Sequence, residues 1–370
     1  MPQLRRLQIE NYRSIQSSSI EFGRMNVLIG ANGSGKSNLI SFFKMMNELA
    51  HERLQRYITE TGRAHSILHF GPKVSNHLSA TIEFSKLLST QGACRYEMSL
   101  YPVAGDTLAF SKERIVQVSL QDGSDSRVIE FKPGLLESSM PECDFKDYPM
   151  MVQVDFDLRS WDVYHFHDTS ATSRIRQFSY AYGETTLMKD AANIAAFLWQ
   201  IKNSDSRCYR RIVETVRLIA PYFHDFSLTL TPQEDVILNW LHAKSDLIFG
   251  PHQLSDGTLR AICLIALLLQ PTPHCPSLLI VDEPELGLHP YALGVIASLF
   301  RSKSESTQVI ISTQSSAFLD HFEPEDVIVA EYRDGKSTFH RPGAEKLNAW
   351  LEEYSLGEIW EKNVIGGGPH

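Results

Sequence analysis

The sequence lacks a hydrophobic run long enough to cross a membrane. The longest uncharged apolar run, Ala261–Leu269, has nine residues, whereas a membrane-spanning helix needs about 20. The first residues, Met1–Arg6, lead directly into a polar alternation without the apolar core of a secretion signal. We therefore expect a protein that neither spans nor binds a membrane and is not secreted.

Cysteine is scarce, and its spacing is not that of a disulfide framework or a zinc site. The chain has five cysteines, an odd number, and no C-x-x-C pair. They are Cys94, Cys143, Cys208, Cys263 and Cys275. This pattern favours reduced thiols with structural roles in a cytoplasmic protein.

Positive charge is not in excess either. The chain has 35 Lys and Arg against 44 Asp and Glu, a net charge of −9, so any DNA contact would need a local basic patch.

A hydrophobic fraction of 43% over 370 residues is ample for a packed core and excludes disorder as the main state. No heptad pattern is sustained, so we expect no long coiled coil. The glycine-rich stretch Gly366–Pro369 predicts a flexible end.

Short strands, a glycine-rich loop and a helix follow one another at the start of the chain. The apolar run Met25–Ile29 predicts a buried strand, and Lys36–Leu49 has apolar residues at near-helical spacing. From His77 to Lys132 the pattern has period two with turn residues between the segments, which predicts an antiparallel sheet. Residues 187–220 return to helical spacing.

The glycine-rich loop Gly30–Ser37 matches the phosphate-binding pattern G-x-x-x-x-G-K-[ST] between a predicted strand and a predicted helix. Glycines let backbone N–H groups turn toward one concavity, and the helix start adds partial positive charge. Lys36 can reach the β- and γ-phosphates, and the Ser37 hydroxyl can bind Mg²⁺. The alternative is an ordinary glycine turn before a helix. The candidate nucleotide-binding residues here are Gly30, Asn32, Gly33, Ser34, Gly35, Lys36, Ser37 and Asn38.

A second candidate is a pair of acids at the end of the apolar strand Leu278–Val281. Ligands gather at the carboxyl ends of strands in parallel α/β sheets. Asp282 is therefore placed to hold Mg²⁺ through water, and Glu283 to orient or deprotonate an attacking water. The alternative for two adjacent carboxylates is a solvated turn.

A third candidate is the turn Leu254–Thr258, which opens the helical run Leu259–Leu269. Ser255 is a good N-cap, and a helix start that carries Gly257 offers a second phosphate-binding surface. The alternative is a turn that only caps the helix.

The stretch Trp161–Ser170 is the most distinctive part of the middle of the chain. His165, His167 and Asp168 could hold a metal ion, although a strand followed by an Asp-Thr-Ser turn explains the pattern as well. Arginines further along could contact phosphates, namely Arg174, Arg176, Arg207, Arg210 and Arg211. For the last three, a solvated helix face is the alternative.

Together the motifs resemble those of the ATP-binding-cassette ATPase superfamily, and within it the heads of the SMC, Rad50, RecF and OLD group. Gly30–Ser37 resembles the Walker A loop, and Leu278–Glu283 resembles Walker B. Leu254–Thr258 resembles the signature motif, with Asp256 where transporters usually have glycine. Glu285–Pro290 resembles the D-loop of the same group.

The resemblance extends to the opening of the chain, where Leu4–Ile15 is similar to the I-x-N-[FY]-R-S strand that begins RecF-type and OLD-type heads. It implies an α/β P-loop ATPase of the cassette type, with a mixed sheet core, an antiparallel β lobe and a helical lobe. It also implies one head with a Walker A lobe, a middle helical lobe, a signature and Walker B lobe, and a C-terminal cap. Their expected limits within 1–370 are about 1–150, 151–250, 251–335 and 336–370.

The resemblance implies ATP and Mg²⁺ as cofactors and a head-to-tail dimer in which Ser255 and Gly257 act in trans. Gln314 stands at the switch position that often holds histidine. Glutamine can hydrogen-bond a γ-phosphate but carries no positive charge, which predicts slow turnover. The alternative is that Gln314 is only a polar residue before a helix. A loop glutamine is also expected in the middle lobe, and Gln153 is the nearest candidate.

The spacing of the motifs separates the members of the superfamily. The stretch from Ser37 to Leu254 is far longer than in a transporter cassette, and the stretch after Gln314 is too short for the nuclease domain of OLD proteins. The resemblance therefore implies an ATPase switch in DNA repair or anti-phage defence that controls a separately encoded nuclease or toxin. The alternatives are a nucleotide-gated scaffold that hydrolyses little ATP and binds a protein effector, and a RecF-like DNA-binding repair factor.

Overall fold

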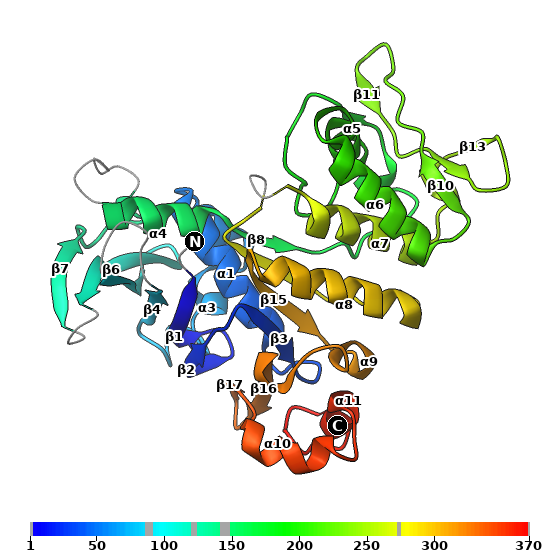
Figure 1. The fold of residues 1–370 in the computed structure, drawn as a ribbon. Helices are drawn as coiled ribbons and strands as arrows, with labels where there is room; N and C mark the ends of the chain where they lie inside the picture. Colours follow the sequence, from blue (N-terminus) through cyan, green and yellow to red (C-terminus); the bar gives the residue numbers. More distant parts are fainter. Residues whose placement is uncertain (1–2, 86–91, 120–123, 141–148, 272–274, 369–370) are drawn as a thin grey trace. The chain divides into compact units, whose positions relative to one another are not determined.

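The chain forms two compact units in the computed structural model, which describes residues 3–85, 92–119, 124–140, 149–271 and 275–368 (Figure 1). Unit 1 contains Met1–Val163, Pro276–Ile280 and Glu323–His370. Unit 2 contains Tyr164–Cys275 and Val281–Phe322. Each unit thus combines segments that lie far apart in the sequence. The four lobes expected above stay a prediction.

An antiparallel sheet forms much of unit 1. Its strands, in spatial order, are β2 (Ile15–Glu21), β1 (Leu4–Tyr12), β4 (Leu78–Phe84), β5 (Gly92–Val103), β6 (Thr107–Ser119) and β7 (Asp125–Glu130). Buried and half-buried residues alternate along β4, as expected for a strand with one face on the core. The predicted antiparallel sheet is therefore confirmed. The opening strand β1 also belongs to this sheet, since it pairs with β4, for example at Leu7 and Ile82.

A parallel pair carries the start of the glycine-rich loop. β3 (Met25–Ile29) runs parallel to β16 (Val327–Arg333), which continues into the antiparallel partner β17 (Lys336–His340). All residues of β3 are buried, which confirms the buried strand predicted from its apolar run. β14 (Leu278–Asp282) neighbours β8 (Trp161–Tyr164), and it passes from unit 1 into unit 2 after Ile280.

Aromatic side chains join the helices of unit 1 to its strands. Phe43 of α1 (Lys36–Ala50) lies 5.3 Å from Trp161 of β8 between ring centroids, and Trp161 lies 6.1 Å from Phe84 of β4. α1 also packs against α4 (Pro149–Arg159). The other helices of unit 1 are α2 (Leu54–Glu60), α3 (Arg63–Ile67), α10 (Ala344–Leu351) and α11 (Leu356–Glu361).

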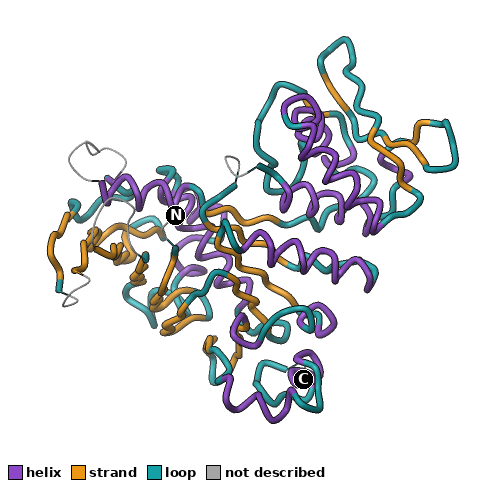
Figure 2. The backbone as a smooth tube through the Cα atoms, viewed as in Figure 1, coloured by secondary structure: helices purple, strands orange, loops and turns teal. Residues whose placement is uncertain are grey.

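Helices are the main regular structure of unit 2, as the purple segments α5 to α8 in Figure 2 show. α7 packs against both α6 and α8, which explains why it is apolar on almost every side. The helices are α5 (Ile194–Ser204), α6 (Ser206–Ile219), α7 (Asp256–Leu269), α8 (Pro290–Ser304) and α9 (Ser316–Leu319). The strands, besides the end of β14, are β9 (Ser179–Tyr180), β10 (Phe223–Phe226), β11 (Asp235–Val236), β12 (Trp240–His242), β13 (Ile248–Phe249) and β15 (Gln308–Thr313).

The helix predicted from residue 187 begins only at Ile194, so that start was wrong. Ala191 has a φ of 55°, outside the right-handed helical region. The Asn193 side chain shapes the preceding turn by accepting from the Met188 N–H at 2.9 Å and donating to the Thr186 carbonyl at 2.9 Å. Side-chain bonds of this kind compete with helix hydrogen bonds, and they delay the helix here.

The described part of the chain contains no helix that is both long and apolar enough to cross a bilayer. Its cysteines, Cys94, Cys208, Cys263 and Cys275, are free thiols, and Cys143 lies outside the described residues. Burial raises the pKa of the Cys94 thiol to about 12, so this thiol stays protonated.

Candidate functional site

The loop Gly30–Ser37 leaves β3 and enters α1 in a conformation that needs glycine. Gly35 has a φ of 107°, and a Cβ there would lie 2.6 Å from the Ser337 Cβ. Gly30 has a φ of 156°, and a Cβ there would lie 2.6 Å from the Ser34 hydroxyl oxygen. Positive φ turns consecutive N–H groups toward one side, as phosphate-binding loops require. Asn32 and Gly33 are exposed, whereas Ser34 is buried.

Lys36, the first residue of α1, lies against the loop. It is 5% exposed, and its Nζ donates to the carbonyls of Gly30 and Ala31, the second at 3.1 Å. The first turn of α1 carries no acidic residue, so nothing there offsets the positive end of the helix dipole. Exposed Ser37 follows directly. These residues therefore fit a bound polyphosphate.

Asn38 has a structural partner in the opening strands. Its Nδ2 donates to the Ser14 hydroxyl at 2.6 Å, and Ser14 shares a second hydrogen bond with the Ser337 hydroxyl at 2.7 Å. The Ser337 N–H also donates to the Ser14 carbonyl at 2.7 Å. The turn after β1 and the start of β17 thus hold the first turn of α1 in place.

Unit 2 carries the acidic pair. Asp282 ends β14, and Glu283 follows with a φ of 45°, a strained conformation for a residue other than glycine. The Glu283 N–H donates to the Ser312 carbonyl of β15 at 2.8 Å, and its carboxylate accepts from the Gln314 side-chain amide. The structure therefore brings together two of the residues selected from the sequence, Glu283 and Gln314.

A second, half-buried glutamate supports this turn. Glu285 accepts from the Thr313 hydroxyl at 2.6 Å and from the Gln314 N–H at 3.2 Å. Burial raises the pKa of its carboxyl group above the ordinary range. Ser315 caps α9 through the Phe318 N–H at 3.1 Å, so Gln314 is free of capping and directs its amide at Glu283.

The helix predicted after Leu254 is confirmed, and its start is tightly packed. The Ser255 hydroxyl caps α7 by accepting from the Thr258 N–H at 3.2 Å. A Cβ on Gly257 would overlap the carbonyl oxygen of Gly287, in the turn that resembles a D-loop. Only glycine therefore fits at position 257 without movement.

Two family models match the chain. Residues 120–320, more than half of it, match the family described as "AAA domain, putative AbiEii toxin, Type IV TA system". The chain belongs to this AAA family. Residues 3–91, which include the glycine-rich loop, match an "AAA ATPase domain". Membership of these ATPase families implies nucleotide binding.

Solved structures of SMC heads share the fold of this AAA domain. An SMC head bound to the C-terminal winged-helix domain of ScpA has a TM-score of 0.61 at 14% identity, covering 93% of this chain and 99% of that one. The Pyrococcus furiosus SMC head with an extended coiled coil, bound to the C-terminal domain of ScpA, has a TM-score of 0.58 at 13% identity, covering 95% and 99%. A search of curated protein sequences finds no match. The predicted fold class, an α/β P-loop ATPase with a mixed sheet and an antiparallel sheet, is confirmed.

The structure contradicts the suggestion that Arg176 contacts phosphates. Arg176 is 5% exposed and donates to the carbonyls of Thr169, at 2.9 Å, and of Pro251. Its guanidinium also pairs with Asp256 of the signature-like turn at 2.7 Å. Arg176 therefore holds this turn from inside unit 2. Exposed Arg174 pairs with Asp190 at 3.4 Å.

Arg260 is a residue of the AAA domain that sequence reasoning missed. From α7 it donates to the carbonyls of Phe166 at 3.1 Å, His167 at 2.9 Å and Leu286 at 3.3 Å. It thereby ties the signature-like turn to the D-loop-like turn and to residues 166–167. A single charge inside the apolar run Leu259–Leu269 is the signal that could have revealed it.

The residues considered for a metal have other partners. Asp168 accepts from the Ser170 N–H at 3.1 Å, the turn expected as the alternative. His167 Nε2 lies 3.3 Å from the Asp282 carbonyl oxygen and 3.9 Å from the Glu283 carboxylate. Among the described residues, no three His, Cys, Asp or Glu side chains are grouped to hold a metal ion.

Gln153, the candidate for a loop glutamine, was wrongly placed. It lies inside α4, where its amide donates to the Asp157 carboxylate at 3.0 Å. The apolar neighbours of Gln153 suit a helix as well as a strand or loop, so the short pattern could not distinguish them. In the described structure it is His167 that lies beside the acidic pair.

Proposed function

We propose that the protein is a Mg²⁺-dependent ATPase that closes into a head-to-tail dimer on ATP and thereby switches a separate effector. The observation that carries this proposal is the loop Gly30–Ser37, whose positive-φ glycines and buried Lys36 adjoin a helix start without acidic residues. Membership of ATPase families supports ATP as the ligand.

The loop residues have separate roles in this proposal. Backbone N–H groups of Gly33 to Ser37 bind the phosphates, together with the positive end of α1. Lys36 exchanges its bonds to the Gly30 and Ala31 carbonyls for bonds to the β- and γ-phosphates. Ser37 and Asp282 would hold Mg²⁺, which would neutralise developing charge on the phosphates.

Glu283 is the proposed general base. Its carboxylate orients the attacking water and takes up its proton. The Gln314 amide, bonded to that carboxylate, keeps it in position, and the strained backbone at Glu283 fixes its direction. Because glutamine adds no positive charge, we expect slow turnover.

Ser255 and Gly257 are proposed to act on the nucleotide of a second copy. The start of α7 offers N–H groups that are suited to an anion, and the Ser255 hydroxyl is exposed. The effector is proposed to be a separately encoded nuclease or toxin. The family description, which names a toxin of a type IV toxin–antitoxin system, supports a toxin-linked role.

The test compares ATP binding, phosphate release and mass in three variants. Lys36→Ala should weaken ATP binding at least about tenfold, because it removes a charge-assisted contact. Glu283→Gln should keep ATP but turn over about a hundredfold more slowly, and light scattering should show a doubled mass only with ATP. Glu214→Gln, on the exposed face of α6, is the matched control and should behave as wild type.

The proposal fails if the wild-type protein binds no ATP, or if Glu283→Gln hydrolyses it at the wild-type rate. The second candidate is the nucleotide-gated scaffold, favoured by the uncharged Gln314 beside Glu283. Tight ATP binding with negligible phosphate release, with and without DNA, would favour the scaffold. Retention of duplex DNA that weakens steeply with salt would instead favour a DNA-binding repair factor.

A further inference from the structure

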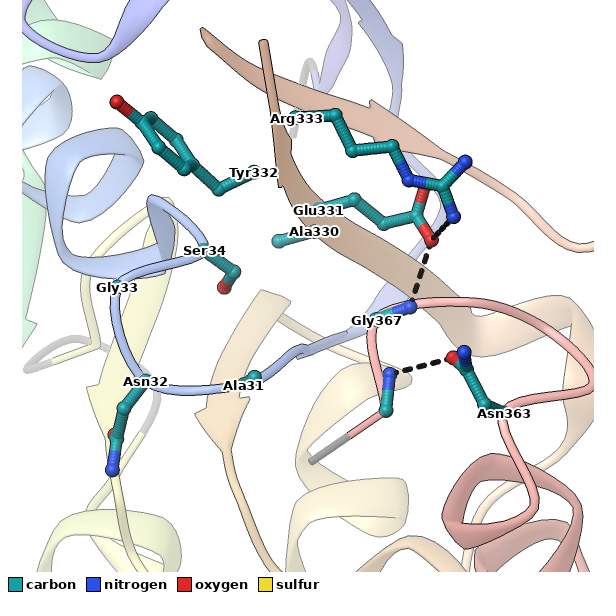
Figure 3. A pocket seen from close by; sticks show the side chains of 11 residues that line it. Ala31, Asn32, Gly33, Ser34, Ala330, Glu331, Tyr332, Arg333, Asn363 and Gly367 are labelled. Atoms are coloured by element: carbon teal, nitrogen blue, oxygen red, sulfur yellow. Dashed lines mark hydrogen bonds and ion pairs between the residues drawn. The ribbon is translucent and has the colours of Figure 1, made fainter. Parts of the chain in front are cut away.

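A cavity of about 470 Å³ lies beside the glycine-rich loop within unit 1 (Figure 3). Its lining includes Ala31–Ser34 and the end of β16, residues Ala330–Arg333. The remaining lining residues, Asn363, Gly367 and Gly368, belong to the segment Asn363–Gly368, here called the C-terminal loop. The sequence predicted a flexible stretch from Gly366, but the structure holds this loop against the rest of unit 1.

Hydrogen bonds hold the C-terminal loop through the two peptide groups on either side of Gly367. The Gly367 N–H donates to the Glu331 carboxylate at 2.9 Å, and its carbonyl accepts from the Trp360 indole N–H at 2.9 Å. The next N–H, of Gly368, donates to the Asn363 side chain at 3.0 Å. Figure 3 shows the bonds from these two N–H groups to Glu331 and Asn363 as dashed lines. The prediction of a flexible end is therefore wrong for residues 366–368.

Gly367 packs directly onto the point where β3 becomes the glycine-rich loop. A Cβ on Gly367 would lie 2.7 Å from a Val329 methyl carbon, 2.9 Å from the Ala330 carbonyl oxygen and 3.5 Å from the Gly30 Cα. Its φ is 62°. The Ala330 carbonyl therefore lies against both Gly30 and Gly367 and leaves no room for a side chain at either glycine.

The same packing extends to the lysine of the loop. Gly367 lies against Gly30. The Gly30 carbonyl accepts from Lys36 Nζ and thereby orients the ammonium group. Ser34, another member of the loop, is 4% exposed, and its hydroxyl has no hydrogen-bond partner among the described residues. A rotation of the Gly30 peptide would therefore move both Lys36 and Ser34.

We propose that the C-terminal loop is a positioning element of the nucleotide site, with Gly367 holding the Gly30 peptide in its phosphate-binding conformation. This inference rests on the proposed function. The C-terminal loop contacts β16 and the start of the phosphate-binding loop, so we expect it to act on ATP binding and not on the chemical step. Any change that loosens Gly367 should raise KM and leave kcat unaltered.

Gly367→Ala is the first test, and Gly105→Ala is its matched control. Gly105 also has a positive φ, of 90°, but nothing lies within 4 Å of a Cβ placed there. Both variants thus carry the backbone strain of alanine at positive φ. Only Gly367→Ala also presses on Val329 and on the Ala330 carbonyl, which itself lies against Gly30. We expect KM for ATP to rise about tenfold in Gly367→Ala, against less than twofold in Gly105→Ala, with kcat within twofold in both.

Hydrogen exchange without nucleotide gives a second readout. Peptides that cover residues 30–35 should exchange faster in Gly367→Ala than in wild type or Gly105→Ala, because the loop loses its brace. Glu331→Gln, which keeps the shape but removes the charge that accepts from Gly367, should shift KM and exchange in the same direction by about threefold. This variant serves if Gly367→Ala does not fold.

Equal KM values and equal exchange in Gly367→Ala and Gly105→Ala would overturn the inference. So would a fall in kcat at unchanged KM, which would place the loop in the chemical step. If the wild-type protein binds no ATP, the proposed function fails, whereas the exchange comparison without nucleotide still decides whether the C-terminal loop holds the glycine-rich loop.

Discussion

Asp157 should make the stability of unit 1 depend on pH. It lies in α4, is 2% exposed, and accepts from the Gln153 amide at 3.0 Å. In the part of the chain that the structure describes, its other carboxylate oxygen has no hydrogen-bond partner. Burial raises the pKa of this carboxyl group from 3.8 to about 7. The folded protein therefore binds this proton more tightly than the unfolded chain. The resulting stability is fully present below pH 3.8 and is lost as the pH rises through about 7.

The size of the effect follows from the shift of about three pKa units. One unit corresponds to about 1.4 kcal/mol, so the full contribution is about 4 kcal/mol. Between pH 5 and pH 9 the free energy of unfolding should fall by about 3 kcal/mol from this group alone. Asp157→Asn keeps the shape and the acceptor for Gln153 but cannot ionise, so the variant should lose most of this slope.

Urea unfolding followed by circular dichroism at pH 5 and pH 9 measures the slope for each protein. Asp155→Asn, on the same helix and paired with Arg159 at 2.8 Å, is the control and should keep the wild-type slope. The reasoning is refuted if Asp157→Asn shows the same loss of stability between pH 5 and pH 9 as wild type.

Two further substitutions test the packing of the signature-like turn. Gly257→Ala would force its new methyl group onto the Gly287 carbonyl. It should lower the free energy of unfolding by about 1–3 kcal/mol and the ATPase rate at least tenfold. Gly343→Ala, with nothing within 4 Å of a Cβ placed there, should match wild type in both assays. Arg176→Met leaves the carbonyl partners of a buried guanidinium unpaired and should cost about 3 kcal/mol in urea unfolding. Exposed Arg174→Met should cost less than about 0.5 kcal/mol, and equal losses in the two arginine variants would contradict the assignment.

Local patterns in the sequence were sufficient for the elements around the glycine-rich loop. The buried strand Met25–Ile29, the loop and the helix from Lys36 each depend on near neighbours, and all three lie where predicted. Ser255 likewise signals its helix start through a side chain that bonds three residues ahead. Such local patterns predict their elements correctly because the elements do not depend on contacts with residues far away in the sequence.

Two of the errors depend on a partner far away in the sequence, and a third on a short pattern that fits more than one structure. Arg176 belongs to a residue type that is usually exposed, and its burial depends on the carbonyls of residues 251 and 254, far along the chain. Gly366–Gly368 has the composition of a flexible end, yet Glu331 and Trp360 hold it. Gln153 and Asp157 bond one turn apart in a helix that its short apolar run could not specify.

At position 283 the residue that favours the proposed activity and the residue that favours stability are different. A left-handed conformation costs a residue with a Cβ about 1–2 kcal/mol, which glycine would avoid. A selection for thermal stability alone would therefore favour glycine at position 283 and discard the carboxylate together with its Gln314 partner. Efforts to stabilise this chain should keep position 283 constant, because the most favourable backbone there is the one without the proposed base.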